Sequence, residues 1–132
     1  MVTFTRGDYV CENESFIISA NDVKNYAETS NDFNAIHLDF QSAVEAGFER
    51  EIVHGMLVMG IAESRLSDVF PTSYVVYYET KFLQPVLVGE LLTISYVVID
   101  EDLDIITIKI EVTKENGKIA IIGVIQFANV GG

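Results

Sequence analysis

The sequence predicts an α+β domain in which an antiparallel sheet wraps around one central helix. Helical patterns are confined to residues 19–69, and the chain that follows alternates apolar and polar side chains in strand-like runs joined by short turns. The segment 55–69 is apolar on most sides, which indicates a helix buried against the sheet. With 132 residues, 49% of them hydrophobic, we expect one domain spanning residues 1–132.

The N-terminal part predicts a strand followed by a capped helix. Residues 8–18 are predicted to form the first strand. Ser19 can cap a helix of about eleven residues, because Asp22 at the third helical position completes a capping box. This helix is predicted to end near Ser30, which places Asp32 just beyond its C-terminus.

The remaining elements are two helices and four strands. Residues 40–46 predict a short helix closed by Gly47, and residues 55–69 predict the central helix, which Pro71 stops. The strands are expected at residues 73–83, 90–100, 103–114 and 118–128. Asn116-Gly117 predicts a hairpin turn between the last two. This order of elements is that of the hot-dog fold, with a candidate catalytic loop inserted before the central helix.

The composition argues against several classes of partner. A net charge of −12, from 20 acidic and 8 basic residues, disfavours nucleic acid and anionic membrane surfaces. The apolar runs are too short to span a bilayer, and the N-terminus lacks a signal-peptide core, so we expect a soluble, cytoplasmic protein. The single Cys11 cannot form an internal disulfide and is interpreted as a small apolar strand residue.

An acid and an imidazole lie close together in the stretch Asp32-Phe33-Asn34-Ala35-Ile36-His37. Because Ser, Asn and Asp favour turns, we expect a loop there, and catalytic groups concentrate on loops. Gly55 begins the central helix, where a first-turn amide lacks an intrahelical acceptor. An acid, an imidazole and such an amide are the parts needed to add water across a polarised double bond. An enzyme is therefore the leading hypothesis.

Three segments of the chain, in order, resemble the signature of the MaoC-like (R)-specific enoyl-CoA hydratases of the hot-dog fold. They are Asp32 to His37, Phe48 to Met56 (Phe-Glu-Arg-Glu-Ile-Val-His-Gly-Met) and Phe82 to Glu90. The resemblance implies hydration of trans-2-enoyl-CoA to (R)-3-hydroxyacyl-CoA, or the reverse dehydration, on an acyl-CoA thioester substrate without a cofactor or a metal. It also implies a homodimer, in which self-pairing would cover an exposed sheet edge.

The resemblance also implies roles for three residues. Asp32 and His37 would hold and deprotonate the attacking water and return a proton to the substrate α-carbon. Gly55 would donate its backbone amide to the thioester oxygen, on which negative charge develops.

Substrate-binding or supporting roles are expected for neighbouring residues. Asn34 is expected to bond the loop backbone and help fix Asp32, and His54 to bond loop backbone or adjacent side chains. Met56 and Met59 are most simply core residues, although flexible thioethers would also suit an acyl tunnel.

This sequence departs from the family pattern at three positions. Ala35 and Glu51 replace prolines, and Glu63 occupies the position of a helix serine that supports the catalytic Asp, with Ser64 about 100° around the helix. If the register holds, the Glu63 side chain enters or borders the acyl tunnel, which predicts a preference for short acyl chains.

Other functions remain open at this point. Taken alone, Asp32 is a turn residue and His37 a satisfied loop histidine, and only the three motifs together favour catalysis. A hot-dog thioesterase and a non-catalytic acyl-CoA-binding module are the alternatives. A metal site made by the two histidines and Asp39 lacks a recognised ligand spacing. The acidity favours CoA thioesters over acyl carrier protein, which is itself acidic.

Overall fold

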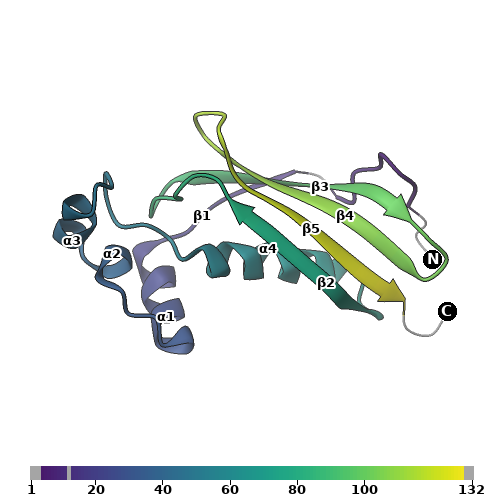
Figure 1. Cartoon of the computed structure of the whole chain (residues 1–132), viewed down its shortest axis with the longest axis horizontal. Coiled ribbons are helices and arrows are strands. Elements are labelled where there is room, and N and C mark those ends of the chain that lie inside the picture. Colours follow the sequence, from purple (N-terminus) through teal and green to yellow (C-terminus); the bar gives the residue numbers. More distant parts are fainter. Residues whose placement is uncertain (1–3, 12, 130–132) are drawn as a thin grey trace.

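The computed structural model describes residues 4–11 and 13–129 (Figure 1). The elements in chain order are β1 (Glu14–Ile17), α1 (Ala20–Ser30), α2 (Ala35–Leu38), α3 (Phe40–Glu45), α4 (Gly55–Val69), β2 (Ser73–Phe82), β3 (Leu91–Glu101), β4 (Ile105–Lys114) and β5 (Ile119–Asn129). The strands form one antiparallel sheet in the order β1-β3-β4-β5-β2. Figure 1 shows α4 running beneath the curved sheet, with α1, α2 and α3 gathered at one end.

Helix α4 packs on the sheet through one narrow stripe. Val58, Ala62 and Leu66 are spaced by one helical turn and are fully buried. Two sheet tyrosines also reach the helix: the Tyr96 hydroxyl donates to the Ala62 carbonyl at 3.0 Å, and the Tyr78 hydroxyl donates to the Met59 carbonyl at 2.7 Å. Apolar burial and these bonds together hold the middle of α4 against the sheet.

The segment before α4 is held by the turn that precedes β3. The Val53 amide donates to the Val86 carbonyl at 2.7 Å, and the Val88 amide donates to the Glu51 carbonyl at 3.0 Å. From β4, the buried Lys114 ammonium donates to the Pro85 carbonyl at 2.9 Å and lies 3.3 Å from the Glu90 carboxylate. This network fixes the chain immediately before Gly55.

The predicted architecture, the capping box and the hairpin turn are confirmed. Ser19 and Asp22 bond reciprocally at the start of α1. At the hairpin, Gly117 has a φ of 86°, a left-handed conformation that glycine adopts at little cost. The central helix begins and ends at the predicted residues.

The first strand is shorter than predicted. Regular pairing with β3 covers only Glu14–Ile17, and an isolated bridge joins Tyr9 to Val97. Asp8 is instead engaged in a turn, because its carboxylate accepts from the Thr5 amide at 2.9 Å. Residue 12, in the middle of the predicted strand, lies outside the described residues.

The helical turn α2 was not predicted from the sequence. Its start is fixed by Asn34, whose side-chain oxygen accepts from the Ile36 amide at 3.2 Å. The region predicted as an irregular loop therefore carries His37 on a helical turn.

Candidate active site

A chain of short side-chain to backbone bonds shapes the loop after α1. Helix α1 ends at Ser30 and is capped by Asn31, which adopts a left-handed conformation with φ 60°. The Ser30 hydroxyl then accepts from the Asp32 amide at 3.3 Å, and the Asp32 carboxylate accepts from the Asn34 amide at 3.3 Å. These turns reverse the chain, and the Asn34 cap then starts α2. Asn34 thus bonds the loop backbone, as predicted from the sequence.

Asp32, His37 and His54 form one cluster. One side-chain nitrogen or oxygen from each lies within 4.8 Å of those from the other two. The rings of His37 and His54 stack, with centroids 3.7 Å apart and an interplanar angle of 21°. His54 is 3% exposed, whereas the Asp32 side chain is 53% exposed. The cluster therefore places the exposed Asp32 carboxylate beside the His37 imidazole. The buried His54 ring packs against one face of that imidazole.

The hydrogen bond to Ile52 fixes the tautomer of neutral His37. Its Nδ1 lies 2.7 Å from the Ile52 carbonyl oxygen, which can only accept. Nδ1 therefore carries the proton, and Nε2 of the neutral ring presents a lone pair. A base of this kind can take a proton from a water molecule.

Gly55 and His37 line the same cavity. This cavity has a volume of about 350 Å³ and is otherwise mostly apolar; its wall includes Met56, Val58, Phe82 and Ile121. Gly55 is the first residue of α4, so its amide lies at the positive end of the helix dipole. A β-carbon at this position would lie 2.7 Å from the Phe82 ring, so the close approach of that ring requires glycine.

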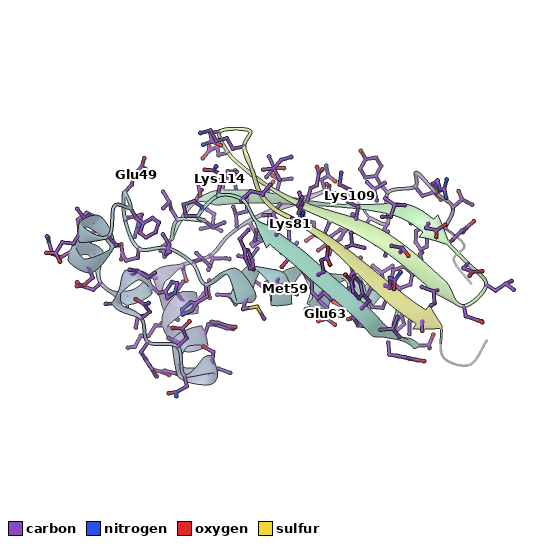
Figure 2. All side chains as sticks on the ribbon, viewed as in Figure 1. Glu49, Met59, Glu63, Lys81, Lys109 and Lys114 are labelled. Atoms are coloured by element: carbon purple, nitrogen blue, oxygen red, sulfur yellow. The ribbon has the colours of Figure 1, made fainter. Side chains whose placement is uncertain are left out.

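The other residues singled out from the sequence occupy two different places. Met56 lines the cavity, but the described residues around it include neither Met59 nor Glu63. Those two lie along α4 beside β2, where both are labelled in Figure 2. The Met59 sulfur accepts from the Thr80 hydroxyl at 3.4 Å, and the Glu63 carboxylate accepts from the Ser67 hydroxyl at 3.0 Å.

Glu63 also acts on a tyrosine of the sheet. Burial, together with the Glu63 carboxylate, raises the pKa of Tyr78 well above its usual value. Glu63 of α4 is therefore close enough to Tyr78 of β2 to interact with it electrostatically.

The donor set of the cluster is poorly suited to a metal ion. Nδ1 of His37 is bonded to the Ile52 carbonyl, and Nε2 of His54 lies 3.0 Å from the Asp32 carbonyl. The in-plane lone pairs of two nearly parallel, stacked rings do not converge on one point, as a metal would require. Asp39, considered from the sequence as a third ligand, caps α3 by accepting from the Ser42 amide at 2.9 Å. Its bonds to Ser42 lower the pKa of Asp39.

His37 also lines a second cavity, of about 490 Å³. Its lining includes Lys24 and Glu28 of α1, together with Phe33 and Glu51. Lys24 was not predicted from the sequence, because only the fold brings it to the same cavity as His37.

Comparison with known proteins identifies the family. The sequence profile of the MaoC like domain matches residues 5–120. The mitochondrial 3-hydroxyacyl-[acyl-carrier-protein] dehydratase of Arabidopsis thaliana is 42% identical over 77 residues, which are 58% of this chain and 46% of that protein. The (R)-specific enoyl-CoA hydratase of Aeromonas caviae is 33% identical over 108 residues, which are 79% of this chain and 81% of that protein.

Solved structures agree with the sequence comparison. The structure of an (R)-hydratase from A. caviae matches with a TM-score of 0.88 and 30% identity, covering 97% of this chain and 98% of that one. This match confirms the predicted hot-dog fold. Both named relatives are hydro-lyases, which confirms the expected enzyme class at the level of the family. On the evidence of the profile, the relatives and the fold, the chain belongs to the MaoC like domain family.

Proposed function

We propose that this protein hydrates trans-2-enoyl-CoA to (R)-3-hydroxyacyl-CoA, or catalyses the reverse dehydration. The observation that carries the proposal is the meeting of Asp32 and His37 in one cluster, with His37 lining the cavity at which α4 begins. The Aeromonas relative, which is aligned over most of both chains, supports the same reaction.

In the proposed mechanism, one water molecule lies between the Asp32 carboxylate and Nε2 of His37. The pair removes a proton from this water while its oxygen bonds to the β-carbon of the enoyl thioester. Negative charge moves to the thioester oxygen, which accepts a hydrogen bond from the Gly55 amide. The pair then returns the proton to the α-carbon. The sum is the addition of one water molecule, and it needs no oxidant, reductant or cofactor.

The cavity at Gly55 suits the acyl part of such a substrate. Its wall is mostly apolar, and Met56 and Phe82 border the Gly55 backbone that would bind the thioester. Asn34 and His54 bond the backbone of the loop that carries the reacting groups, at the Ile36 amide and the Asp32 carbonyl.

The carrier of the acyl group is proposed to be CoA. A net charge of −12 is unfavourable for docking an acidic carrier protein. A second candidate substrate is the acyl carrier protein thioester, and the Arabidopsis relative favours it by its name and its 42% identity. Parallel assays with crotonyl-CoA and crotonyl-acyl carrier protein distinguish the two, and we expect the higher kcat/KM with crotonyl-CoA.

We further propose that the protein acts as a homodimer joined through β2. In the described sheet, β2 is an edge strand that pairs only with β5. It leaves Tyr74, Val76 and Phe82 about half exposed. A long edge with exposed apolar side chains is the kind of surface that self-association covers.

Two variants test the catalytic assignment. Asp32→Asn and His37→Ala should each lower the rate of crotonyl-CoA hydration by about a hundredfold or more, because each removes a positioned acid or base. The absorbance of the enoyl thioester provides the assay, and circular dichroism checks folding. Near-normal rates in both folded variants would refute the mechanism.

A further inference from the structure

We propose that His54 is a positioning residue that holds Asp32 and His37 in register with the start of α4. This inference rests on the proposed function, and it assigns His54 a role through its neighbours with no contact to the substrate. The position of His54 first suggests a helix cap, since it is the residue immediately before α4. Its side chain, however, makes no capping bond to that helix. The imidazole is therefore directed elsewhere.

The first contact of the imidazole is with the backbone of the catalytic loop. Nε2 of His54 lies 3.0 Å from the Asp32 carbonyl oxygen, so it carries a proton and donates. The same nitrogen lies 3.8 Å from the Asp32 carboxylate. The His54 ring therefore links Asp32, which carries the acid, to the start of α4. The next residue, Gly55, is the one that would bind the thioester oxygen.

The second contact is with the base. The His37 ring lies flat on the His54 ring at 3.7 Å, and the bond from its Nδ1 to Ile52 fixes the rotation of His37 within that plane. Tyr26 of α1 packs on His54 in a T-shaped arrangement at 4.9 Å. With two aromatic neighbours and 3% exposure, the His54 ring has little freedom to move.

Burial of His54 costs stability that an apolar residue at this position would not lose. Its Nδ1 is buried and has no partner among the described residues. A buried acceptor without a hydrogen bond is destabilising, and an apolar side chain would avoid that loss. An imidazole at this buried position is explained if the geometry of the loop needs both its Nε2 donor and its flat face.

Two substitutions separate this role from a contribution to stability. In His54→Gln the amide nitrogen occupies about the place of Nε2 and can still donate to Asp32. In His54→Asn the amide is too short to reach Asp32, yet asparagine is a good N-cap, so the helix start is preserved. Tyr96→Phe is the matched control, because it removes another buried bond to a backbone carbonyl, at Ala62 in the middle of α4.

The experiment measures kcat, KM and the melting temperature of the three variants with crotonyl-CoA. We expect His54→Asn to lose about tenfold to a hundredfold in kcat, the scale of a misplaced catalytic group, while KM stays nearly unchanged. His54→Gln should recover part of that loss, because it restores the donor to the Asp32 carbonyl but not the stacked ring, and Tyr96→Phe should melt earlier with its kcat intact. Equal kcat in His54→Asn and the wild type would overturn the inference, as would equal losses in His54→Asn and His54→Gln.

A second readout does not depend on the reaction. Long-range ¹H–¹⁵N spectra report which ring nitrogen of His37 is protonated, and the wild type should show the Nδ1–H form. In His54→Asn we expect averaging between tautomers, because without the stacked ring His37 can rotate away from the Ile52 carbonyl that fixes its tautomer. An unchanged His37 spectrum would overturn the positioning role. Absence of hydration by the wild type, with this spectral change present, would instead refute the proposed function alone.

Discussion

Adding one methyl group at Gly55 tests how closely the substrate must approach the start of α4. A β-carbon there would lie 2.7, 2.9 and 3.0 Å from three atoms of the Phe82 ring. Carbon atoms in contact prefer about 3.5–4.0 Å, so the ring must move by about 1 Å. Because Phe82 is 53% exposed, it can move outward, and Gly55→Ala should lower the free energy of unfolding by only about 1 kcal/mol, the low end for overpacking.

The effect on catalysis should be much larger than the effect on folding. The new methyl group and the displaced ring both occupy the space next to the Gly55 amide, where the thioester oxygen would bind. Loss of one donor to a developing oxyanion lowers kcat by about 10²–10³-fold. We expect Gly55→Ala to approach this range with crotonyl-CoA, measured by the loss of enoyl thioester absorbance.

A double variant separates the methyl group from the ring. In Gly55→Ala/Phe82→Ala the ring is absent, so the free energy lost to overpacking should be recovered, whereas the block at the amide should remain. Wild-type kcat/KM in Gly55→Ala would refute the assignment of this amide to the thioester oxygen. Full recovery of activity in the double variant would show that the displaced Phe82 ring, and not the methyl group, causes the loss of activity.

Three further predictions concern the scaffold, the sheet edge and the acyl pocket. Lys114→Met should lower the free energy of unfolding by about 3 kcal/mol, because it leaves the Glu90 carboxylate and the Pro85 carbonyl without their buried partner. Urea unfolding measures this loss, and the double variant Lys114→Met/Glu90→Gln should regain part of it. Replacing both Tyr74 and Val76 with lysine should convert the proposed dimer to a monomer in light scattering, and an unchanged mass would exclude the β2 edge as the interface. Glu63 lies outside the described lining of the cavity at Gly55, but a longer acyl chain would extend beyond that cavity along α4. Glu63→Ser should therefore raise kcat/KM for octenoyl-CoA relative to crotonyl-CoA, and an unchanged ratio would show that Glu63 does not shape the acyl pocket.

The sequence predicted the parts of the fold that depend on local signals. Apolar periodicity located α4, the Ser19 and Asp22 pair located the start of α1, and Asn116-Gly117 located the last hairpin. The N-terminal strand was predicted too long, because alternation alone does not reveal that Asp8 closes a turn with Thr5. The turn α2 was missed, because asparagine is common in loops and the sequence does not show that the Asn34 side chain accepts from the Ile36 amide.

The site was predictable as a set of residues but not as a geometry. The three motifs indicated that Asp32, His37 and Gly55 belong together, and the fold brings the first two into one cluster and His37 and Gly55 onto one cavity. The stacking of His54 on His37 arises from tertiary packing across α2 and α4, which no spacing in the sequence encodes. The places of Met59 and Glu63 beside β2, away from the described lining of that cavity, also emerged only from the fold.

The subcellular location was expected to be cytoplasmic and stays a prediction. In the part of the chain that the structure describes, no helix has the length and apolarity needed to cross a membrane.

The fate of the oxygen atom of water tests the central claim most directly. Purified protein is incubated with crotonyl-CoA in H₂¹⁸O, and the product is analysed by mass spectrometry and chiral chromatography. The proposed mechanism predicts (R)-3-hydroxybutyryl-CoA with ¹⁸O in the hydroxyl group, formed about a hundredfold more slowly by Asp32→Asn. Release of free CoA with ¹⁸O in the carboxylate of crotonate would instead establish a thioesterase and contradict the hydratase assignment.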